Sequence, residues 1–418
     1  MKLTSYKIKD LINGLYDGPH ATPKPADEGP VFLGIKNITE DGSLDLSDIR
    51  HISPSEYPKW TKRVVPQGND IVFSYEATLH RYAIIPDDFI GCLGRRMALI
   101  RPNLEKINTN YLYYYFFTDL WRNEVARYIL IGSTVDRIPL TKFPDFEVVL
   151  PDLKTQNNIA SILSAYDDLI ENNQRRIRIL EEMAQNLFRE WFVHFRYPGH
   201  ENIPLTDSPL GPIPDGWEIC KLKDFGRVIT GKTPSTRKPE YYGGDIPFVK
   251  TPDMHGNAII FNAEQKLTQL GAESQSNKYI PSESILVSCI GTIGVVSITA
   301  CECQTNQQIN SLIPYDDWTK IYLYQVCRGL KETLMGLGST GATMGNVNKG
   351  KFEGIDILKP DLKILKKYHA ICSPQMALIE SLLRINCNLA KSRNLILPKL
   401  ISGKIDVSEV TMPKEDAA

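Results

Sequence analysis

The sequence predicts an α/β (α+β) protein with two similar domains of mixed strands and helices. Two long helices, which pair as an antiparallel coiled coil with pseudo-twofold symmetry, are expected to separate these domains. Three observations lead to this prediction. The chain repeats itself with a period near half its length, each copy opens with a long Gly- and Pro-rich segment of short β-branched and aromatic runs, and each copy closes with one heptad-patterned helix.

The internal repeat is carried by matches that keep their order along both halves. KFPDFEVVLPDLK closes the first copy and KFEGIDILKPDLK closes the second, with Phe143 and Phe352 standing 209 residues apart. Upstream, Gly132-Ser133-Thr134 matches Gly338-Ser339-Thr340, and Ile71–Ser74 matches Ile285–Ser288. The shift changes slightly between matches, as loop insertions would produce. Chance similarity does not explain an ordered series of this length.

The repeat divides the chain into six segments. Pro/Gly-rich RYPGHENIPLTDSPLGPIPDGW reads as an extended linker between the copies. The expected segments are a first domain (1–150), a central long helix (151–197), the linker (198–215), a second domain (216–360), a C-terminal long helix (361–403) and a polar tail (404–418).

The long helices carry apolar residues at alternating spacings of three and four. The first begins at Asp152, a plausible N-cap after Pro151. Each pattern also includes an Asn, and a buried Asn in such a seam typically fixes its register. The alternative is that each helix packs only on its own domain. The residues expected to pair are Leu163, Tyr166, Ile170, Asn173, Ile177 and Leu180 on the first helix, and Ile379, Leu382, Asn386, Leu389 and Ile396 on the second.

Composition limits the partners and the compartment. The formal net charge of −1 is unusual for an autonomous nucleic-acid binder, because phosphate contacts dominate affinity. Either DNA is not the partner, or another subunit brings much of the positive charge. Without an export signal or an apolar run that could span a membrane, we expect a cytoplasmic protein that makes no membrane contact. Its eight scattered cysteines are then expected to be reduced.

No complete catalytic constellation was found in the sequence. Gly226–Thr233 satisfies the GxxxxGK[ST] phosphate-loop pattern, but Pro234 and Pro239 argue against the helix that such a loop requires. Cys301 and Cys303 lack a second pair at zinc-site spacing. HExxH and nucleophile-elbow motifs are absent. We therefore expect no catalytic residue, no bound metal and no cofactor.

Two polar segments occupy equivalent places in the repeat. Thr305–Asn310 concentrates carboxamides, which suit bidentate recognition of adenine. Its counterpart Leu93–Ala98 contains Arg95 and Arg96, which suit guanine or phosphate. Different chemistry at equivalent positions is what two different DNA half-sites would require. The alternative is an ordinary solvated strand edge.

Several stretches resemble one known family over essentially the whole chain. They are FLGIKNI, IPFVKTPDM, LPDLKTQNNIASILSAYDDLIENNQ, QNLFREWFVHF, GPIPDGWEICKLKDF and LILPKLISGKI. In these stretches the chain resembles the specificity subunit of type I restriction–modification systems.

The resemblance implies a non-catalytic DNA-reading subunit with two target recognition domains. Each domain would read one half of an asymmetric, bipartite target, and the helices would set the gap. Two adenine-methylating modification subunits, which hold S-adenosylmethionine, are the expected partners. A restriction subunit that uses ATP and Mg²⁺ is a further expected partner. A two-domain scaffold that does not bind DNA, and a nucleotide-binding enzyme using the Gly226 loop, remain the alternatives.

Candidate DNA-contacting residues are the polar side chains of the loops and strand ends in both copies. In the first copy they are Lys36, Asn37, Ser74, Thr78, His80, Arg81, Arg95, Arg96, Ser133 and Thr134; in the second they are Lys232, Thr233, Ser235, Thr236, Arg237, Lys250, Thr251, Ser288, Thr292, Asn306, Gln307, Gln308, Asn310, Ser339 and Thr340.

Overall fold

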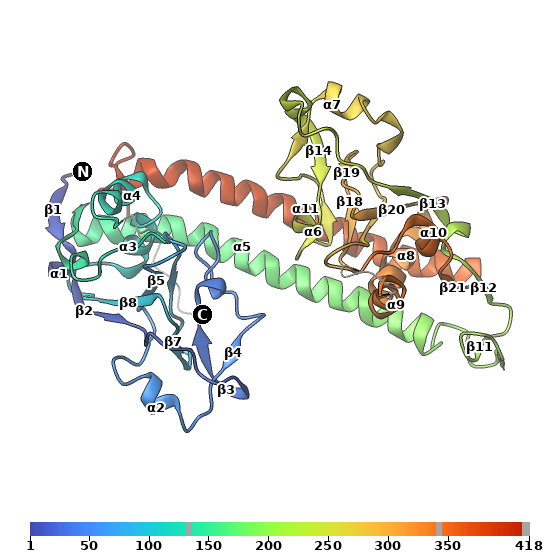
Figure 1. The fold of residues 1–418 in the computed structure, drawn as a ribbon, viewed down its shortest axis with the longest axis horizontal. Coiled ribbons are helices and arrows are strands. Elements are labelled where there is room, and N and C mark those ends of the chain that lie inside the picture. The colour runs from blue at the N-terminus through green and yellow to red at the C-terminus, as the bar shows by residue number, and fades with distance from the viewer. Residues whose placement is uncertain (131–134, 340–344, 412–418) are drawn as a thin grey trace. The chain divides into compact units, whose positions relative to one another are not determined.

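The computed structural model describes residues 1–130, 135–339 and 345–411, and it divides into two compact units. Unit 1 comprises Met1–Glu171 and Cys387–Ala418, and unit 2 comprises Asn172–Asn386. Both unit boundaries cut the two long helices, α5 (Leu153–Phe188) and α11 (Leu362–Ile401) (Figure 1). Each long helix therefore contributes one part to each compact unit.

The main sheet of unit 1 is antiparallel, in the order β2-β8-β5-β6. Side chains on its strands alternate between two cores, as the pleat requires. Ile71 and Phe73 face a core shared with α3 and α4, while Val72 faces the opposite core. The strands are β2 (Ile12–Asp17), β5 (Ile71–Ser74), β6 (Tyr82–Ile84) and β8 (Met97–Pro102), and the two helices are α3 (Thr109–Tyr115) and α4 (Asp119–Ala126).

A smaller sheet, β4-β3-β7, and an antiparallel pair, β1-β9, complete the strands described in unit 1. Strand β3 runs parallel to β7 and antiparallel to β4. The bounds are β1 (Thr4–Lys7), β3 (Ala26–Leu33), β4 (Arg50–His51), β7 (Gly91–Leu93), β9 (Glu147–Leu150), α1 (Ile8–Leu11), η1 (Ile35–Asn37), α2 (Tyr57–Trp60) and η2 (Phe143–Asp145).

Unit 2 repeats this plan with equivalent strands. Its main sheet has the order β13-β20-β17-β18-β15, its smaller sheet β16-β14-β19, and β12 pairs with β21. The parallel pair β3-β7 has its counterpart in the parallel pair β14-β19. These strands are β12 (Glu218–Lys221), β13 (Gly226–Thr230), β14 (Tyr242–Val249), β15 (Ile259–Ile260), β16 (Lys266–Leu267), β17 (Ile285–Ser288), β18 (Val296–Thr299), β19 (Gln304–Thr305), β20 (Ile309–Pro314) and β21 (Asp356–Lys359).

Short helices connect the strands of unit 2, and the matching topology confirms the internal repeat. Strand β15 extends the main sheet through a parallel pairing with β18, which distinguishes this sheet from that of unit 1. The helices are η4 (Leu222–Asp224), η5 (Pro239–Tyr241), α6 (Thr251–Met254), α7 (Gln269–Glu273), η6 (Ser276–Lys278), η7 (Asp317–Thr319), α8 (Lys320–Gly329), α9 (Lys331–Gly338) and α10 (Lys349–Glu353).

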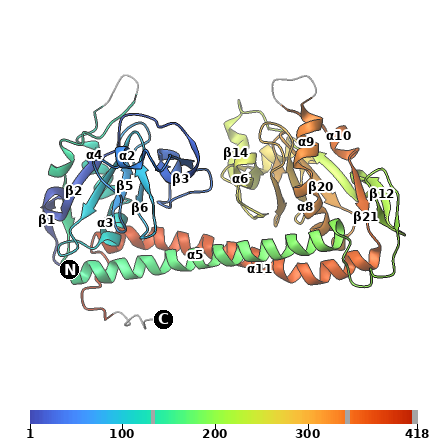
Figure 2. The ribbon, with the colours of Figure 1, turned by 90° about the horizontal axis from the view of Figure 1, so that it is seen from below.

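Helices α5 and α11 pack antiparallel in each unit, which confirms the predicted pairing (Figures 1 and 2). In unit 2, the Asn173 Nδ2 donates to Asn386 Oδ1 at 2.8 Å, and the Tyr368 hydroxyl donates to the Ala184 carbonyl at 3.2 Å. In unit 1, the Arg393 guanidinium pairs with the Asp167 carboxylate. All the residues predicted to pair are buried or half-buried.

The ends of the helices show where local sequence decides the structure. Asp152 is the N-cap that was predicted, because its Oδ1 accepts a hydrogen bond from the Thr155 amide at 3.0 Å. After Phe188 the helix widens into the π-turn η3 (Arg189–Val193). Adjacent Trp191 and Phe192 are both buried, which the wider turn allows.

The segment between the copies and the start of the tail both make packing contacts. The linker folds into a short hairpin of β10 (Leu205–Thr206) and β11 (Ile213–Pro214). Tyr197 stacks on Trp217 with a ring separation of 5.1 Å, so the prediction of an extended linker is wrong. In the tail, Val407 is buried in the core of unit 1, and its carbonyl accepts a hydrogen bond from Asn158.

In the described ranges, which omit 131–134, 340–344 and 412–418, no helix is both long and apolar enough to cross a membrane.

The helix seam predicts a position-dependent cost of charge. Ile379→Asp should lower the free energy of unfolding by roughly 3 kcal/mol or more, because Ile379 is fully buried and an unpaired carboxylate there loses its solvation. Ile179→Asp is the control, since Ile179 lies on α5 with 51% of its surface exposed. Chemical denaturation measures both variants. Equal unfolding midpoints for the two would contradict the pairing of α5 with α11.

Candidate nucleic-acid interface

Three segments of unit 2 meet at one end of its main sheet. They are the turn between β19 and β20, the residues just after β13, and the turn between β17 and β18. The Gly231 amide donates to the Ile309 carbonyl at 3.1 Å, and the Lys232 amide donates to the Thr305 carbonyl at 2.9 Å. The Cys289 amide donates to the Gln308 carbonyl at 2.7 Å. These backbone bonds fix the turn Asn306–Gln308 against its neighbours.

Unit 1 builds the same arrangement with equivalent backbone bonds. The Gly18 amide donates to the Met97 carbonyl at 2.8 Å, and the Tyr75 amide donates to the Arg96 carbonyl at 3.1 Å. Arg95 and Arg96 therefore stand where Gln307 and Gln308 stand in unit 2. This confirms the predicted equivalence of the two polar segments.

Within each turn, one side chain is exposed, and the next is held by an ion pair or a hydrogen bond. Arg96 has a positive φ of 71° and pairs with Glu76 at 3.0 Å, whereas Arg95 is exposed. Gln308 accepts a hydrogen bond from Asn306 at 2.9 Å. Exposed Gln307 accepts one from the Thr233 hydroxyl at 2.7 Å, which orients its carboxamide. Arg95 and Gln307 are thus the exposed side chains of these two turns.

Several candidate residues are buried and serve the loops instead. The Ser74 hydroxyl donates to the Thr78 carbonyl, and its equivalent Ser288 donates to the Thr292 carbonyl at 2.5 Å. The Asn310 Nδ2 donates to the Val347 carbonyl at 3.1 Å. Six of the candidate side chains are buried, namely Asn37, Ser74, Thr251, Ser288, Asn306 and Asn310. Direct contact of these side chains with DNA stays a prediction.

The other candidates are at least partly accessible, but several already have a partner. Lys36 pairs with Asp48 at 2.6 Å, and Arg81 pairs with Glu40 at 2.6 Å. Burial lowers the pKa of His80, so its ring is neutral near pH 7 and less suited to a phosphate. Ser133, Thr134 and Thr340 lie outside the described residues. The remaining accessible candidates are Thr78, Lys232, Ser235, Thr236, Arg237, Lys250, Thr292 and Ser339.

The phosphate-loop pattern does not form a phosphate loop. Gly226–Thr230 is the strand β13, paired along its length with β20. The chain then continues past Thr233 without a helix until the single 3-10 turn η5. The amide array and helix dipole that hold phosphate are therefore not assembled at this motif. Among the described residues, no group of three or more His, Cys, Asp or Glu is arranged to hold a metal ion.

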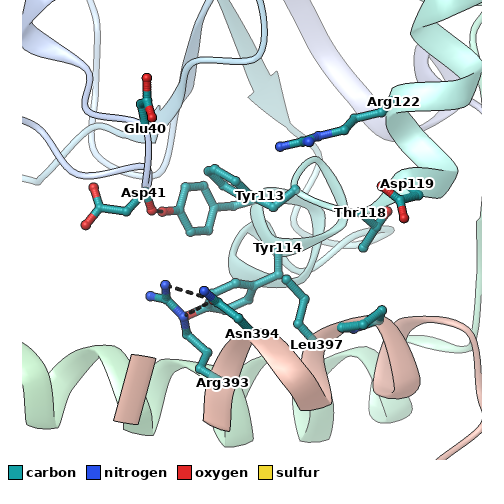
Figure 3. A pocket seen from close by; sticks show the side chains of 12 residues that line it. Glu40, Asp41, Tyr113, Tyr114, Thr118, Asp119, Arg122, Arg393, Asn394 and Leu397 are labelled. Atoms are coloured by element: carbon teal, nitrogen blue, oxygen red, sulfur yellow. Dashed lines mark hydrogen bonds between the residues drawn. The ribbon is translucent and has the colours of Figure 1, made fainter. Parts of the chain in front are cut away.

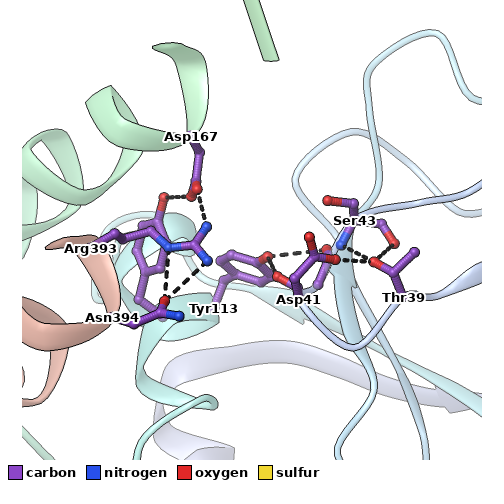
Figure 4. Close-up of polar contacts among 9 residues, drawn as sticks. Thr39, Asp41, Ser43, Tyr113, Asp167, Arg393 and Asn394 are labelled. Carbon is purple, nitrogen blue, oxygen red and sulfur yellow. Dashed lines mark hydrogen bonds and ion pairs between the residues drawn. The ribbon is translucent and has the colours of Figure 1, made fainter. Parts of the chain in front are cut away.

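Unit 1 also contains a pocket of about 460 Å³ that the sequence did not indicate (Figure 3). Side chains from α3, α4, α11 and the Glu40–Asp41 turn line it. Beside it, the Tyr114 hydroxyl donates at 2.5 Å to Asp167, the carboxylate that also pairs with Arg393 (Figure 4). Burial raises the pKa of Tyr114, which keeps the hydroxyl a donor. These contacts tie the domain of unit 1 to its helices.

The fold and the two turns define a tandem-repeat α/β protein, in which equivalent turns of two domains present different polar side chains. A family model described as the type I restriction modification DNA specificity domain matches residues 26–182 and 214–382. Because these matches cover most of the chain, it belongs to the family of type I restriction–modification specificity subunits.

Individual relatives agree with this family. The chain is 29% identical to the Type I restriction enzyme HindI specificity subunit of Haemophilus influenzae, over 90% of this chain and 94% of that protein. It is 26% identical to the MjaIX specificity subunit of Methanocaldococcus jannaschii, over 97% of this chain and 90% of that protein. The crystal structure of a type I restriction–modification S subunit from M. genitalium shares the fold, with a TM-score of 0.56, 12% identity and 96% coverage of both chains.

The turn of unit 2 depends on a close approach at Gly231. A Cβ at this position would lie 2.2 Å from the Asn306 carbonyl oxygen, and backbone at that distance must move. Gly231→Ala should therefore lower the free energy of unfolding by about 1–3 kcal/mol. Gly336→Ala in helix α9 is the control, because open space surrounds it and Ala favours a helix. Thermal unfolding of both variants measures the difference, and a Gly231→Ala variant as stable as the control would contradict the close packing of this turn.

Proposed function

We propose that this chain reads an asymmetric, bipartite DNA target, with one half-site for each domain. The observation that carries the proposal is the pair of equivalent turns, in which Arg95 of unit 1 stands where Gln307 stands in unit 2. Two domains with the same fold place their reading side chains alike. Different side chains at that place then select different bases.

The chemistry of each exposed turn residue suits one kind of base. A guanidinium donates two hydrogen bonds to guanine N7 and O6, which suits Arg95. A carboxamide both donates and accepts, which matches adenine N6 and N7 and suits Gln307. The bond from Thr233 holds the Gln307 carboxamide in one orientation, so less freedom is lost on binding.

Partner subunits complete the function in this proposal. A chain with a formal net charge of −1 needs help to hold phosphate, and two adenine-methylating modification subunits would supply it. Exposed apolar residues offer docking positions on both helices: Leu169 on α5 is 55% exposed, and Leu378, its repeat equivalent on α11, is 39% exposed. Equivalent positions on the two helices suit two copies of one partner.

The chemical steps belong to the partners in this proposal. S-adenosylmethionine would be held by the modification subunits, and ATP and Mg²⁺ by a restriction subunit. This chain would contribute position and base selection. Mapping methylated adenines in a genome, after expression of this chain with its modification subunits, tests the whole proposal. A symmetric or single-part target would overturn it.

Substitutions in the turns should change one half-site at a time. Gln307→Ala should cost about 1–3 kcal/mol of discrimination at one base of one half-site, while Arg95→Ala should affect only the other. Gln174→Ala, an exposed carboxamide on α5, is the control for Gln307. Binding of the assembled complex to duplexes with single-base changes measures this. Equal weakening on every sequence would instead mark the residue as a phosphate contact.

The length of the helices should set the gap between the half-sites. Four residues inserted after Gln185 lengthen α5 by about 6 Å and rotate the rest of the helix by about one full turn, so the seam keeps its face. We expect the gap to grow by one or two base pairs, with both half-sites unchanged. Two inserted residues rotate the seam by about 200° and should disrupt pairing. An unchanged gap in the methylation map of the four-residue variant would show that the length of α5 does not set the gap.

A further inference from the structure

A polar layer interrupts the apolar seam between α5 and α11 in unit 2. The Asn173 Nδ2 donates to Asn386 Oδ1 at 2.8 Å, and Asn173 is only 8% exposed. One seam step further along α5 stands Ile177, and one step back along α11 stands Leu382. Both are buried in the same apolar cluster. The Asn173 side chain thus obtains from Asn386 a hydrogen bond that an apolar side chain of the seam could not give it.

The internal repeat relates these two layers to each other. With the shift of 209 residues, Asn173 corresponds to Leu382, and Ile177 corresponds to Asn386. If the two copies of the repeat were exchanged, the polar layer of Asn173 and Asn386 would take the place of the apolar layer of Ile177 and Leu382. The hydrogen-bonded pair exists because the asparagine stands at different repeat positions in α5 and α11. The two helices therefore have different seams.

We infer that the Asn173–Asn386 pair selects pairing of α5 with α11 and rejects pairing of like helices from two copies of the chain. Suppose that α5 packed antiparallel on the α5 of a second chain, in the register that α5 and α11 have now. Asn173 of one α5 would then face Ile177 of the other. If α11 packed on a second α11, Asn386 would face Leu382. Pairing of two α5 helices would bury both Asn173 carboxamides against apolar side chains, and each one that lacks its hydrogen bond lowers the pairing equilibrium by about tenfold or more.

A shifted register does not make the pairing of two α5 helices favourable. Placing Asn173 opposite a second Asn173 would bring Ile177 opposite Leu169. Leu169 is 55% exposed and lies off the seam, so the apolar layers would no longer meet. The arrangement that satisfies both the apolar layers and the asparagines is the one observed.

This selection has a consequence for specificity, which rests on the function proposed above. Two chains joined through like helices would bring together two identical reading domains and so favour a symmetric target. Pairing α5 with α11 keeps one domain of each kind together. The asparagine pair is then a specificity-determining feature that makes no contact with DNA.

The full-length chain tests the inference without DNA or partner subunits. Asn173→Leu and Asn386→Ile copy the side chains of the equivalent apolar layer. Asn386→Ile leaves the buried Asn173 carboxamide without its partner and should lower the folding equilibrium about tenfold, while Asn173→Leu removes the same hydrogen bond from Asn386. The double variant should regain the stability and also gain pairing between copies. Co-purification of two co-expressed, differently tagged chains measures that pairing, and the double variant should exceed the wild type several-fold.

Two further variants make the result decisive. Asn172→Leu adds the same side chain at an exposed neighbouring position, and it should match the wild type in both measurements. Ile177→Asn should increase pairing between copies, because Asn173 would then meet an asparagine in a second α5. Co-purification of the double variant and of Ile177→Asn at the wild-type level would overturn the inference, as would wild-type stability of both single variants. Because the assay contains no DNA, such a failure is distinct from failure of the proposed reading function.

Discussion

Burial of the apolar seam shared by α5 and α11 is the constraint on which the rest of the structure depends. The same helices also complete the domain cores. Ile159 and Leu163 of α5, with Leu400 of α11, lie in the core of unit 1 that holds the main sheet. In unit 2 that role falls to Tyr368 and Ile379 of α11. A change in helix register would therefore disturb two domain cores as well as the seam, which makes the pairing hard to alter in small steps.

The two units attach domain to helix with different chemistry on the same plan. In unit 1 a polar contact adds to the apolar core, because Asp167 receives both the Tyr114 hydroxyl and the Arg393 guanidinium. In unit 2 the contact is aromatic, with Phe192 packed edge-on against Tyr322 and Tyr368 at 4.8 and 5.0 Å. An ion pair with an added hydrogen bond is directional, whereas an aromatic cluster depends on shape and area. The repeat thus preserves the packing of elements without preserving the contacts that hold them.

The sequence predicted the repeat, the two mixed domains and the helix seam, because a heptad spacing leaves one apolar face that must be buried. It did not locate α3, since the aromatic run from Tyr111 to Phe117 has the composition of a strand and becomes helical through packing in the core. It also could not separate buried from exposed polar residues. Asn310 is buried because Val347, 37 residues away, supplies a carbonyl to it, and only the tertiary fold brings the two together.

Comparison of the two copies shows which positions physical chemistry restricts. At buried strand positions the residues correspond closely, as Ile71, Val72 and Ser74 do with Ile285, Leu286 and Ser288, because volume and internal hydrogen bonds limit the choice. At the exposed turn, Arg95 is replaced by Gln307, while two equivalent backbone bonds hold both turns. An exposed side chain on such a turn can change without loss of packing in the core. A fold with this division can acquire new recognition chemistry at the turn while its domains keep their structure.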